Sequence, residues 1–314
     1  DVDIVSATDG WMIQAAADDN GTLARWNGQR WQTVQTPATG RLRALDMASP
    51  SEGWAMGSGT VALHGGNNGW TPVATPDVVI RDVDSVTPID AWAVGGACDG
   101  SGNACTSTIL RWNGQAWSST PSPTHYPLLS VAMISANDGW AVGGRCLVSS
   151  TQPAPCSHVI LRWNGSNWAV WLNESGADKA PFSAVSVAGS TTGWILEGST
   201  RLLRWTGTQW LPDAQAAAGI NSVDAVSSQA AWAAGPSGLL KWDGASWSSV
   251  AQTQHLNWLA IDVDPGGYGA VVGSAGASLA WNGAAWTPIT RFIGGDVAPE
   301  SAPPWACRAG CTTQ

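Results

Sequence analysis

Aspartates recur at one position of a repeated pattern in this sequence, and a carboxylate can bind a cation or accept hydrogen bonds. Aligning the first strand expected in each repeat places five of them in register: Asp3, Asp46, Asp84, Asp224 and Asp262, with Ala132 and Ser186 at that position of the two other repeats. A buried carboxylate must accept hydrogen bonds or meet a cation. We expect each aspartate to form a central ring by accepting backbone N–H groups of the adjacent repeat. The alternative is a cation or a water cluster on the axis.

A second set of polar and aromatic residues falls in and beside four long connections, over residues 97–107, 118–127, 145–157 and 173–181. The candidate binding residues are Asp99, His125, Tyr126, Arg145, His158, Trp171, Glu174, Asp178 and Lys179. This density is unusual for a chain with 12% charged residues, and variable loops on a constant frame are typical binding elements. One alternative is that long loops only tolerate insertion. Another is metal chelation by His125, His158 and Asp178, but solvated loop histidines are commoner, so no metal or cofactor is predicted.

Six cysteines form three close pairs along the chain. The pairs are Cys98 with Cys105, Cys146 with Cys156, and Cys307 with Cys311. Local disulfides are the simplest interpretation, and they indicate an oxidising compartment: extracellular, cell-surface or periplasmic. A metal site would need thiolates that converge from different places, and no histidine lies at zinc-finger spacing. Free thiols are the remaining alternative.

The elements that must position these residues follow from a tryptophan repeat. The chain of 314 residues contains 22 tryptophans, and a pattern close to D-G-W-A-V-G-G followed by I-L-R-W-N-G-x-x-W returns in seven units. The units span residues 1–40, 41–79, 80–127, 128–181, 182–219, 220–256 and 257–290. Residues in each unit alternate with period two and are interrupted by Asn-Gly or Asp-Gly turns, which is typical of short antiparallel strands joined by hairpins.

A four-stranded sheet cannot bury both of its faces alone, whereas several sheets around an axis can. We therefore predict an all-β fold: one seven-bladed β-propeller over residues 1–290, with four strands, A to D, per blade. A short irregular C-terminal tail, residues 291–314, with a small disulfide loop would follow. In propellers the B–C and D–A connections emerge on one face, so the four long connections of units three to five should neighbour one another.

A cation precedes the C-strand tryptophan in most units: Arg25, Arg111, Arg162, Arg204 and Lys241, with His64 and Ala280 as exceptions. Stacking of the cation on a neighbouring ring explains this column structurally. The alternative is a sugar or carboxylate site repeated in every blade.

Composition excludes some partners. The formal net charge is −9, so nucleic acid and anionic membranes are poor partners. The sequence has no run of 18 or more apolar residues, so no membrane span is predicted. Because it opens directly on an expected strand at residues 1–4, we also expect that any leader has been removed.

The motifs at residues 138–144 and 160–168 give a family resemblance. The chain resembles the kelch-like and neuraminidase-repeat-like propellers of bacterial secreted and surface proteins. It is also similar to the propeller of the photosystem assembly factor family, although the second turn here reads W-N-G-x-x-W. The resemblance implies a non-enzymatic binding or assembly propeller.

The residues themselves show no sialidase constellation, no phosphate-binding loop and no Ser-His-Asp order. We therefore expect no enzyme, and a secreted or cell-surface module that binds a protein partner or self-assembles through the loops of units three to five. A carbohydrate-binding lectin is the alternative, because propeller lectins use Trp, Asn and Asp. A glycan-active enzyme is a third and less favoured hypothesis.

Overall fold

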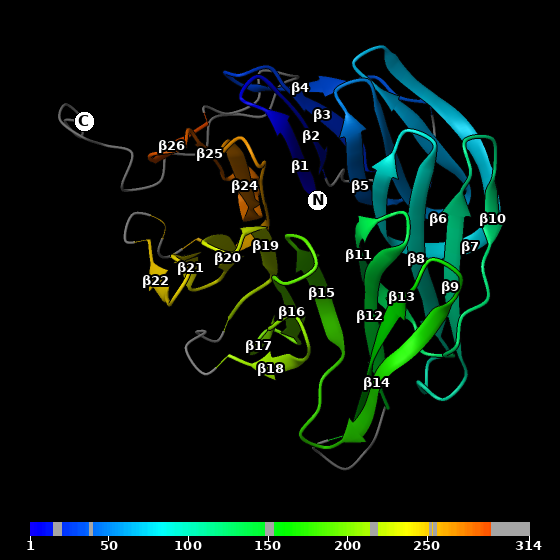
Figure 1. The fold of residues 1–314 in the computed structure, drawn as a ribbon. Coiled ribbons are helices and arrows are strands. Elements are labelled where there is room, and N and C mark those ends of the chain that lie inside the picture. The colour runs from blue at the N-terminus through cyan, green and yellow to red at the C-terminus, as the bar shows by residue number, and fades with distance from the viewer. Residues whose placement is uncertain are drawn as a thin grey trace.

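The chain folds as an all-β propeller, in which antiparallel sheets surround a central axis (Figure 1). The computed structural model describes residues 1–14, 21–37, 40–147, 154–213, 219–250, 253 and 256–289. Within these residues helical conformation is limited to the short 3-10 turn η2 (Ser274–Gly276) and to Thr253. The predicted tail 291–314, with Cys307 and Cys311, lies outside the described residues.

Five of the sheets have four strands each, in which consecutive strands pair from the axis outward. The first contains β1 (Val2–Ser6), β2 (Asp9–Gln14), β3 (Thr22–Trp26) and β4 (Trp31–Val34). The sheet of unit four contains β11 (Leu128–Ser135), β12 (Asp138–Cys146), β13 (Cys156–Trp163) and β14 (Trp168–Gly176). The sheet of unit five contains β15 (Phe182–Val187), β16 (Gly193–Glu197), β17 (Arg201–Trp205) and β18 (Trp210–Pro212). The sheet of unit six contains β19 (Ser222–Ser227), β20 (Ala230–Gly235), β21 (Gly238–Trp242) and β22 (Trp247–Ser249). The sheet of unit seven contains β23 (Trp258–Val263), β24 (Gly269–Gly273), β25 (Ser278–Trp281) and β26 (Trp286–Pro288).

The remaining sheet has six strands and corrects the predicted blade number. Its order is β10-β9-β8-β7-β6-β5. The strands are β5 (Leu42–Ser49), β6 (Glu52–Gly66), β7 (Gly69–Thr87), β8 (Asp90–Cys98), β9 (Cys105–Trp112) and β10 (Trp117–Ser119). The described residues thus form six blades, five of four strands and one of six, and the prediction of seven four-stranded blades is wrong.

The reason lies in β7, which pairs with β6 at its start and with β8 at its end, so units two and three share one sheet. Within β6, the rings of Trp54 and His64 stack with centroids 4.3 Å apart. In a straight strand, Trp54 and His64 would lie roughly 30 Å apart, so β6 folds back on itself. The six-stranded blade therefore contains the residues of two sequence units.

The turns between the outer strands follow the residue types at their tips. In the connection from β13 to β14, Gly165 has a φ of +88°, which favours glycine. The side-chain oxygen of Asn164 accepts the N–H groups of Ser166 and Asn167 at 3.0 and 2.9 Å. This Asx turn fixes the register of the hairpin, in which Trp163 pairs with Trp168.

Indole rings fill the interfaces between neighbouring units, with one buried tryptophan packed against an outer tryptophan of the next unit. The pairs are Trp11–Trp70, Trp54–Trp112, Trp92–Trp163, Trp140–Trp205, Trp194–Trp242 and Trp232–Trp281, with ring centroids 4.7 to 5.1 Å apart. Edge-to-face and tilted packing at this distance is favourable. Each such tryptophan on the second strand of its unit is almost fully buried.

Candidate functional site

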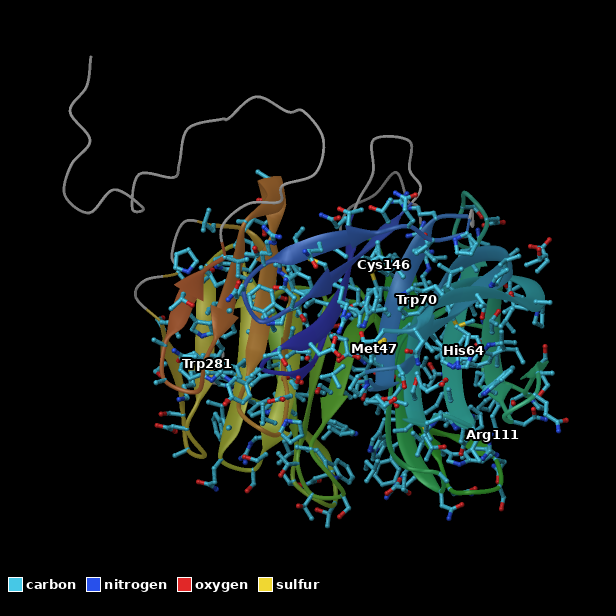
Figure 2. All side chains as sticks on the ribbon, turned by 90° about the horizontal axis from the view of Figure 1, so that it is seen from above. Met47, His64, Trp70, Arg111, Cys146 and Trp281 are labelled. Carbon is cyan, nitrogen blue, oxygen red and sulfur yellow. A yellow bond between two sulfur atoms is a disulfide. The ribbon has the colours of Figure 1, made fainter. Side chains whose placement is uncertain are left out.

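Two hairpins of units three and four are longer than the corresponding hairpins elsewhere. Strands β8, β9, β12 and β13 have 9, 8, 9 and 8 residues, whereas β16, β17, β20 and β21 have 5, 5, 6 and 5. Three extra residues lengthen a strand by about 10 Å. In Figure 2, Cys146 near the tip of one hairpin and Arg111 near the base of the other lie toward opposite faces of the propeller.

A disulfide closes the end of each long hairpin. Cys98 pairs with Cys105 across β8 and β9, and Cys146 pairs with Cys156 across β12 and β13. These are two of the three predicted disulfides, and the third involves residues outside the described part. Residues 148–153 of the second hairpin also lie outside it.

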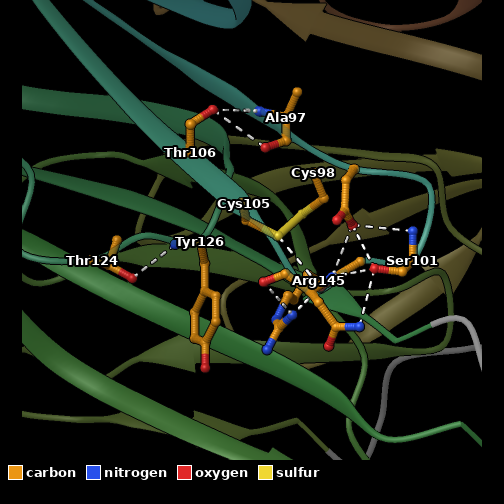
Figure 3. The surroundings of a disulfide bond; sticks show 11 residues. Ala97, Cys98, Ser101, Cys105, Thr106, Thr124, Tyr126 and Arg145 are labelled. Carbon is orange, nitrogen blue, oxygen red and sulfur yellow. Dashed lines mark hydrogen bonds between the residues drawn. A yellow bond between two sulfur atoms is a disulfide. The ribbon is translucent and has the colours of Figure 1, made fainter.

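Asp99 orders the loop that the first disulfide closes. Its Oδ1 accepts the Ser101 N–H at 3.1 Å, the Ser101 hydroxyl at 2.7 Å and the Asn103 N–H at 3.0 Å (Figure 3). The hydrogen bond from the Ser101 side chain is the main cause of the lowered pKa of Asp99. The carboxylate is thus engaged within its own loop.

Arg145 connects the two hairpins. Its Nη1 donates to the carbonyl oxygens of Gly102 and Asn103, the latter at 3.3 Å. Its guanidinium carbon lies 5.4 Å from the ring centroid of Tyr126, which is 9% exposed (Figure 3). His125 packs against Tyr126 with centroids 4.4 Å apart. Asp99, His125, Tyr126 and Arg145 therefore form one connected group between units three and four.

His158 is the centre of a second group, and it is buried, with 3% exposure. Its ring stacks on Phe182 with centroids 4.1 Å apart and an interplanar angle of 12°. Its Nδ1 lies 3.1 Å from the Ala180 carbonyl oxygen and 3.4 Å from Oε1 of Glu197, and its Nε2 lies 3.4 Å from Oε2 of Glu174. His158 is thus not a solvated loop histidine, because it bridges units four and five.

Two further candidates extend this group to the surface. Lys179 Nζ lies 2.7 Å from Oε2 of Glu174 and 3.9 Å from Oδ2 of Asp178. The hydrogen bond between Lys179 and Glu174 lowers the pKa of Glu174 and raises that of Lys179. The Asp178 side chain is 76% exposed, so it can be reached by a partner.

The two groups lie on opposite faces of one sheet. Arg145 pairs with Ser157 across β12 and β13, and His158 is the next residue. Successive side chains of a strand point to opposite faces. Arg145 accordingly contacts unit three and His158 contacts unit five, so the candidate residues divide into two clusters on either side of the unit-four sheet.

Trp171 belongs to neither cluster. It is the extra residue at a bulge in β14, where Val170 pairs with Leu161 and Leu172 pairs with Ile160. Its ring lies edge-on to Trp140 at 5.3 Å and remains 44% exposed. The bulge thus turns an indole onto the outer edge of the interface between units four and five.

The predicted aspartates line a central channel with a cavity volume of 470 Å³. Each accepts a backbone N–H from the next unit: Asp3 from Met47 at 2.6 Å, Asp46 from Ser85 at 2.7 Å, Asp84 from Met133 at 3.0 Å, Asp224 from Val263 at 3.0 Å and Asp262 from Ile4 at 2.7 Å. The Ser186 hydroxyl accepts the Ala225 N–H at 2.9 Å in the same way. Ala132 has no such acceptor, so the series is interrupted there.

A second tier lies two residues earlier in the same strands, and the sequence interpretation missed it. Asp1 accepts the Leu45 N–H at 2.9 Å, and Asp82 accepts the Val131 N–H at 2.9 Å. Ser130 accepts the Val185 N–H at 3.1 Å. The signal was available, because period two places residues 1 and 82 on the same face as Asp3 and Asp84.

Burial is the main cause of raised pKa values in the channel. It raises the pKa of Asp46, Asp82 and Asp224 to about 6. The pKa values of Asp3 and Asp262 rise further, because burial is reinforced by neighbouring carboxylates. Among the described residues no group of three or more His, Cys, Asp or Glu side chains could hold a metal ion.

The cation column also has partners that were not predicted. The Arg111 guanidinium donates to both carboxylate oxygens of Asp90 at 2.9 and 3.0 Å, and Arg162 binds Asp138 in the same fork at 3.1 and 3.2 Å. Each of these arginines also lies 4.9 Å from the ring centroid of a tryptophan in its own unit. The signal was the Asp of the D-G-W or D-A-W motif, which lies two residues before that tryptophan.

Comparisons with known proteins are consistent with the fold. No protein-family model and no curated protein sequence matches the chain. Among solved structures, YCF48 bound to D1 peptide has a TM-score of 0.62 and 15% identity, covering 89% of this chain and 91% of that chain. YCF48 from Cyanidioschyzon merolae has a TM-score of 0.59 and 17% identity, covering 90% and 93%. The WD40 propeller domain of Doa1 has a TM-score of 0.65 and 11% identity, covering 90% and 91%.

These similarities place the chain in the class of β-propellers with four-stranded antiparallel units. At these identities the likeness is one of fold. No helix of the described residues is long and apolar enough to cross a lipid bilayer.

Proposed function

We propose that the chain is a non-enzymatic propeller that binds a protein or peptide partner through the hairpin surface, meaning residues 99–104, 145–147, 154–158 and 174–179. The observation that carries this proposal is the contact of Arg145 with the Gly102 and Asn103 carbonyls. This contact joins the ends of two long hairpins that come from different units. Tyr126, from the connection 118–127, packs against the Arg145 guanidinium and supports this contact.

The hairpin surface is preorganised, which favours binding. Two disulfides close the hairpin ends, and the Asp99 carboxylate holds its loop with three hydrogen bonds. A surface that is already ordered loses little conformational entropy when a partner binds, so more of the contact energy appears as affinity.

The surface also offers a charged edge, at which two exposed carboxylates flank Lys179. The Asp178 side chain is 76% exposed and that of Glu174 is 45% exposed. The chain carries a net charge of −9. A partner segment with basic residues flanking its contact residues would therefore be attracted to this edge, with a rate that falls at high salt.

The solved structures support a binding role by analogy. One similar propeller, YCF48, is bound to D1 peptide, and another is the WD40 domain of Doa1. Two disulfides support a non-cytosolic, oxidising compartment for this chain: extracellular, cell-surface or periplasmic.

The test is selection of peptides from a random display library on the purified chain, followed by calorimetric measurement of each peptide. The proposal predicts saturable binding that falls at least about tenfold, or roughly 1.4 kcal/mol, in Arg145→Ala and Asp178→Ala. Leu211→Ala is the matched control, because Leu211 is 42% exposed on strand β18 of unit five, outside the hairpin surface. An equal loss of peptide affinity in Leu211→Ala, or equal affinity of the peptides for all variants, would show that the hairpin surface is not the binding site.

A glycan array on the same protein tests the carbohydrate alternative. Saturable sugar binding that disappears in Trp171→Ala, together with no selected peptide, would replace the protein-binding proposal with a lectin. No sugar binding and a selected peptide would support the proposal as stated.

A further inference from the structure

Strand β14 differs in length from the last strands of the other sheets. It contains nine residues, whereas β4, β10, β18, β22 and β26 contain four, three, three, three and three. β14 is the outer strand of the unit-four sheet, and no described strand pairs with its far side (Figure 1). In an antiparallel edge strand, the N–H and C=O groups of every second residue point away from the sheet. β14 therefore presents the longest row of such groups among these strands.

Proline occupies two of the short outer edges. Pro212 is the third residue of β18 and Pro288 is the third residue of β26, and each still pairs with the neighbouring strand of its sheet. A proline in an edge strand has no N–H to offer to another strand, so it discourages strand addition. The third residue of β14 is Val170, which is 44% exposed. The edge of unit four thus keeps the N–H that these two edges lack.

Two exposed side chains lie on the unit-five face of β14. The Trp171 ring lies 5.7 Å from that of Trp205 and remains 44% exposed. Glu174 pairs with His158, the residue that contacts unit five, and its side chain is 45% exposed. The bulge places Trp171 beside Leu172, two residues before Glu174. An added strand would therefore meet an indole ring and, one residue pair further along this face, a negative charge.

We propose that the partner peptide adds to β14, along residues 170–176, as a fifth strand of the unit-four sheet. Main-chain hydrogen bonds to the free edge supply affinity, and the alternate side chains of the peptide supply specificity. The peptide places an apolar residue over Trp171 and a lysine or arginine opposite Glu174, two positions apart in its own sequence. This inference rests on the proposed function, because residues 174–176 belong to the hairpin surface.

The first test changes the peptide and leaves the protein as it is. The probe is a peptide selected from the random display library on the purified chain, synthesised as a series with one N-methylated amide at each successive position. An added strand donates only every second N–H to β14, so calorimetry should show affinity losses of at least about threefold at alternating positions, as expected for one lost hydrogen bond. The positions between them should keep their affinity. No loss at any position, or an equal loss at all positions, would overturn strand addition.

The second test changes the edge itself. Val170→Pro introduces the residue that β18 and β26 already carry at this position, so the sheet should keep its pairing and its melting temperature. The variant lacks one N–H of the edge, and affinity for the unmodified peptide should fall at least about threefold. Ser249→Pro is the matched control, because it makes the same change at the third residue of β22 in unit six. Equal affinity of wild type and Val170→Pro would overturn the proposal.

The outcomes separate this inference from the proposed function. A selected peptide that is weakened by Arg145→Ala, but neither by Val170→Pro nor by alternate N-methylation, keeps the hairpin surface and overturns strand addition. A peptide that Arg145→Ala and Asp178→Ala leave unaffected, but that Val170→Pro weakens, supports strand addition to β14 and removes the hairpin surface as the binding site. Failure to select any peptide would overturn both.

Discussion

The backbone N–H of Ile4 donates a 2.7 Å hydrogen bond to Oδ2 of Asp262, and the two residues are 258 positions apart in the sequence. All strands of unit one and all strands of unit seven come from their own ends of the chain. The ring therefore closes without a strand exchanged between the ends. Side-chain packing and this one carboxylate hold the seam.

The first prediction concerns that hydrogen bond. Asp262→Ala leaves the Ile4 N–H without its acceptor in a buried setting, so it should lower the free energy of unfolding by about 1 to 3 kcal/mol. Asp262→Asn keeps an oxygen acceptor and should cost less. Urea denaturation measures both, and equal values for the two variants would show that the carboxylate does not act through this bond.

The raised pKa values of the channel aspartates determine how the stability of the fold should depend on pH. The pKa values of Asp46, Asp82 and Asp224 rise from 3.8 to about 6 on folding. At pH values between 3.8 and about 6, the folded state therefore binds more protons than the unfolded state. The contribution to stability is complete below pH 4 and is lost as pH rises through about 6. The melting temperature should be higher at pH 5 than at pH 8.

A matched pair of variants tests the cause of this pH dependence. Asp46→Asn removes one titrating group but keeps an oxygen to accept the Ser85 N–H, so the melting temperature should vary less between pH 5 and pH 8. Asp99→Asn, in an exposed loop, should not reduce the difference. A melting temperature that rises toward pH 8 in the wild type would contradict the burial argument.

The disulfides should stabilise the fold by amounts set by their short loops. They join residues 7 and 10 positions apart. Replacing Cys98 and Cys105 together by serine should cost roughly 2 to 3 kcal/mol in the chain-entropy model. The same replacement at Cys146 and Cys156 should cost a similar amount. Urea denaturation without reductant measures both, and costs below about 0.5 kcal/mol would show that the paired strands already supply the constraint.

Two tryptophans in contact should differ sharply in their importance for stability. Trp140 is fully buried and Trp171, which packs on it, is 44% exposed. Trp140→Ala should destabilise the chain by about 3 to 5 kcal/mol because it leaves a large cavity. Trp171→Ala should cost less than about 1 kcal/mol. Comparable losses would mean that the indole of Trp171 is part of the core rather than a surface group.

The fold was predictable because the repeat carries strong local signals, in particular the buried Trp of each D-G-W-like motif and the Asn-Gly turns. The blade count was not predictable from them. Residues 75–79 end unit two, and they include Pro76 and Asp77, which are residue types depleted in strands, so the sequence indicates a break between units two and three. Val78 and Val79 pair with Gly59 and Ser58, so β7 continues across the boundary.

The grouping of the candidate residues in space could not be predicted from the sequence. The positions of Arg145 and His158 near one hairpin end suggested a single patch, but strand alternation places them on opposite faces. Glu197 and Phe182, which surround His158, were missed because their contacts cross between units and leave no local pattern. Predicting them would require the packing of one sheet on the next.

The most direct test of the proposed function is amide hydrogen exchange of the chain with and without a selected peptide bound. The account predicts slower exchange for residues 99–104, 154–158 and 174–179, with β20 and β21 of unit six, which lie outside the hairpin surface, unchanged. Protection confined to the central channel or to units six and seven would contradict the assignment of the hairpin surface as the binding site.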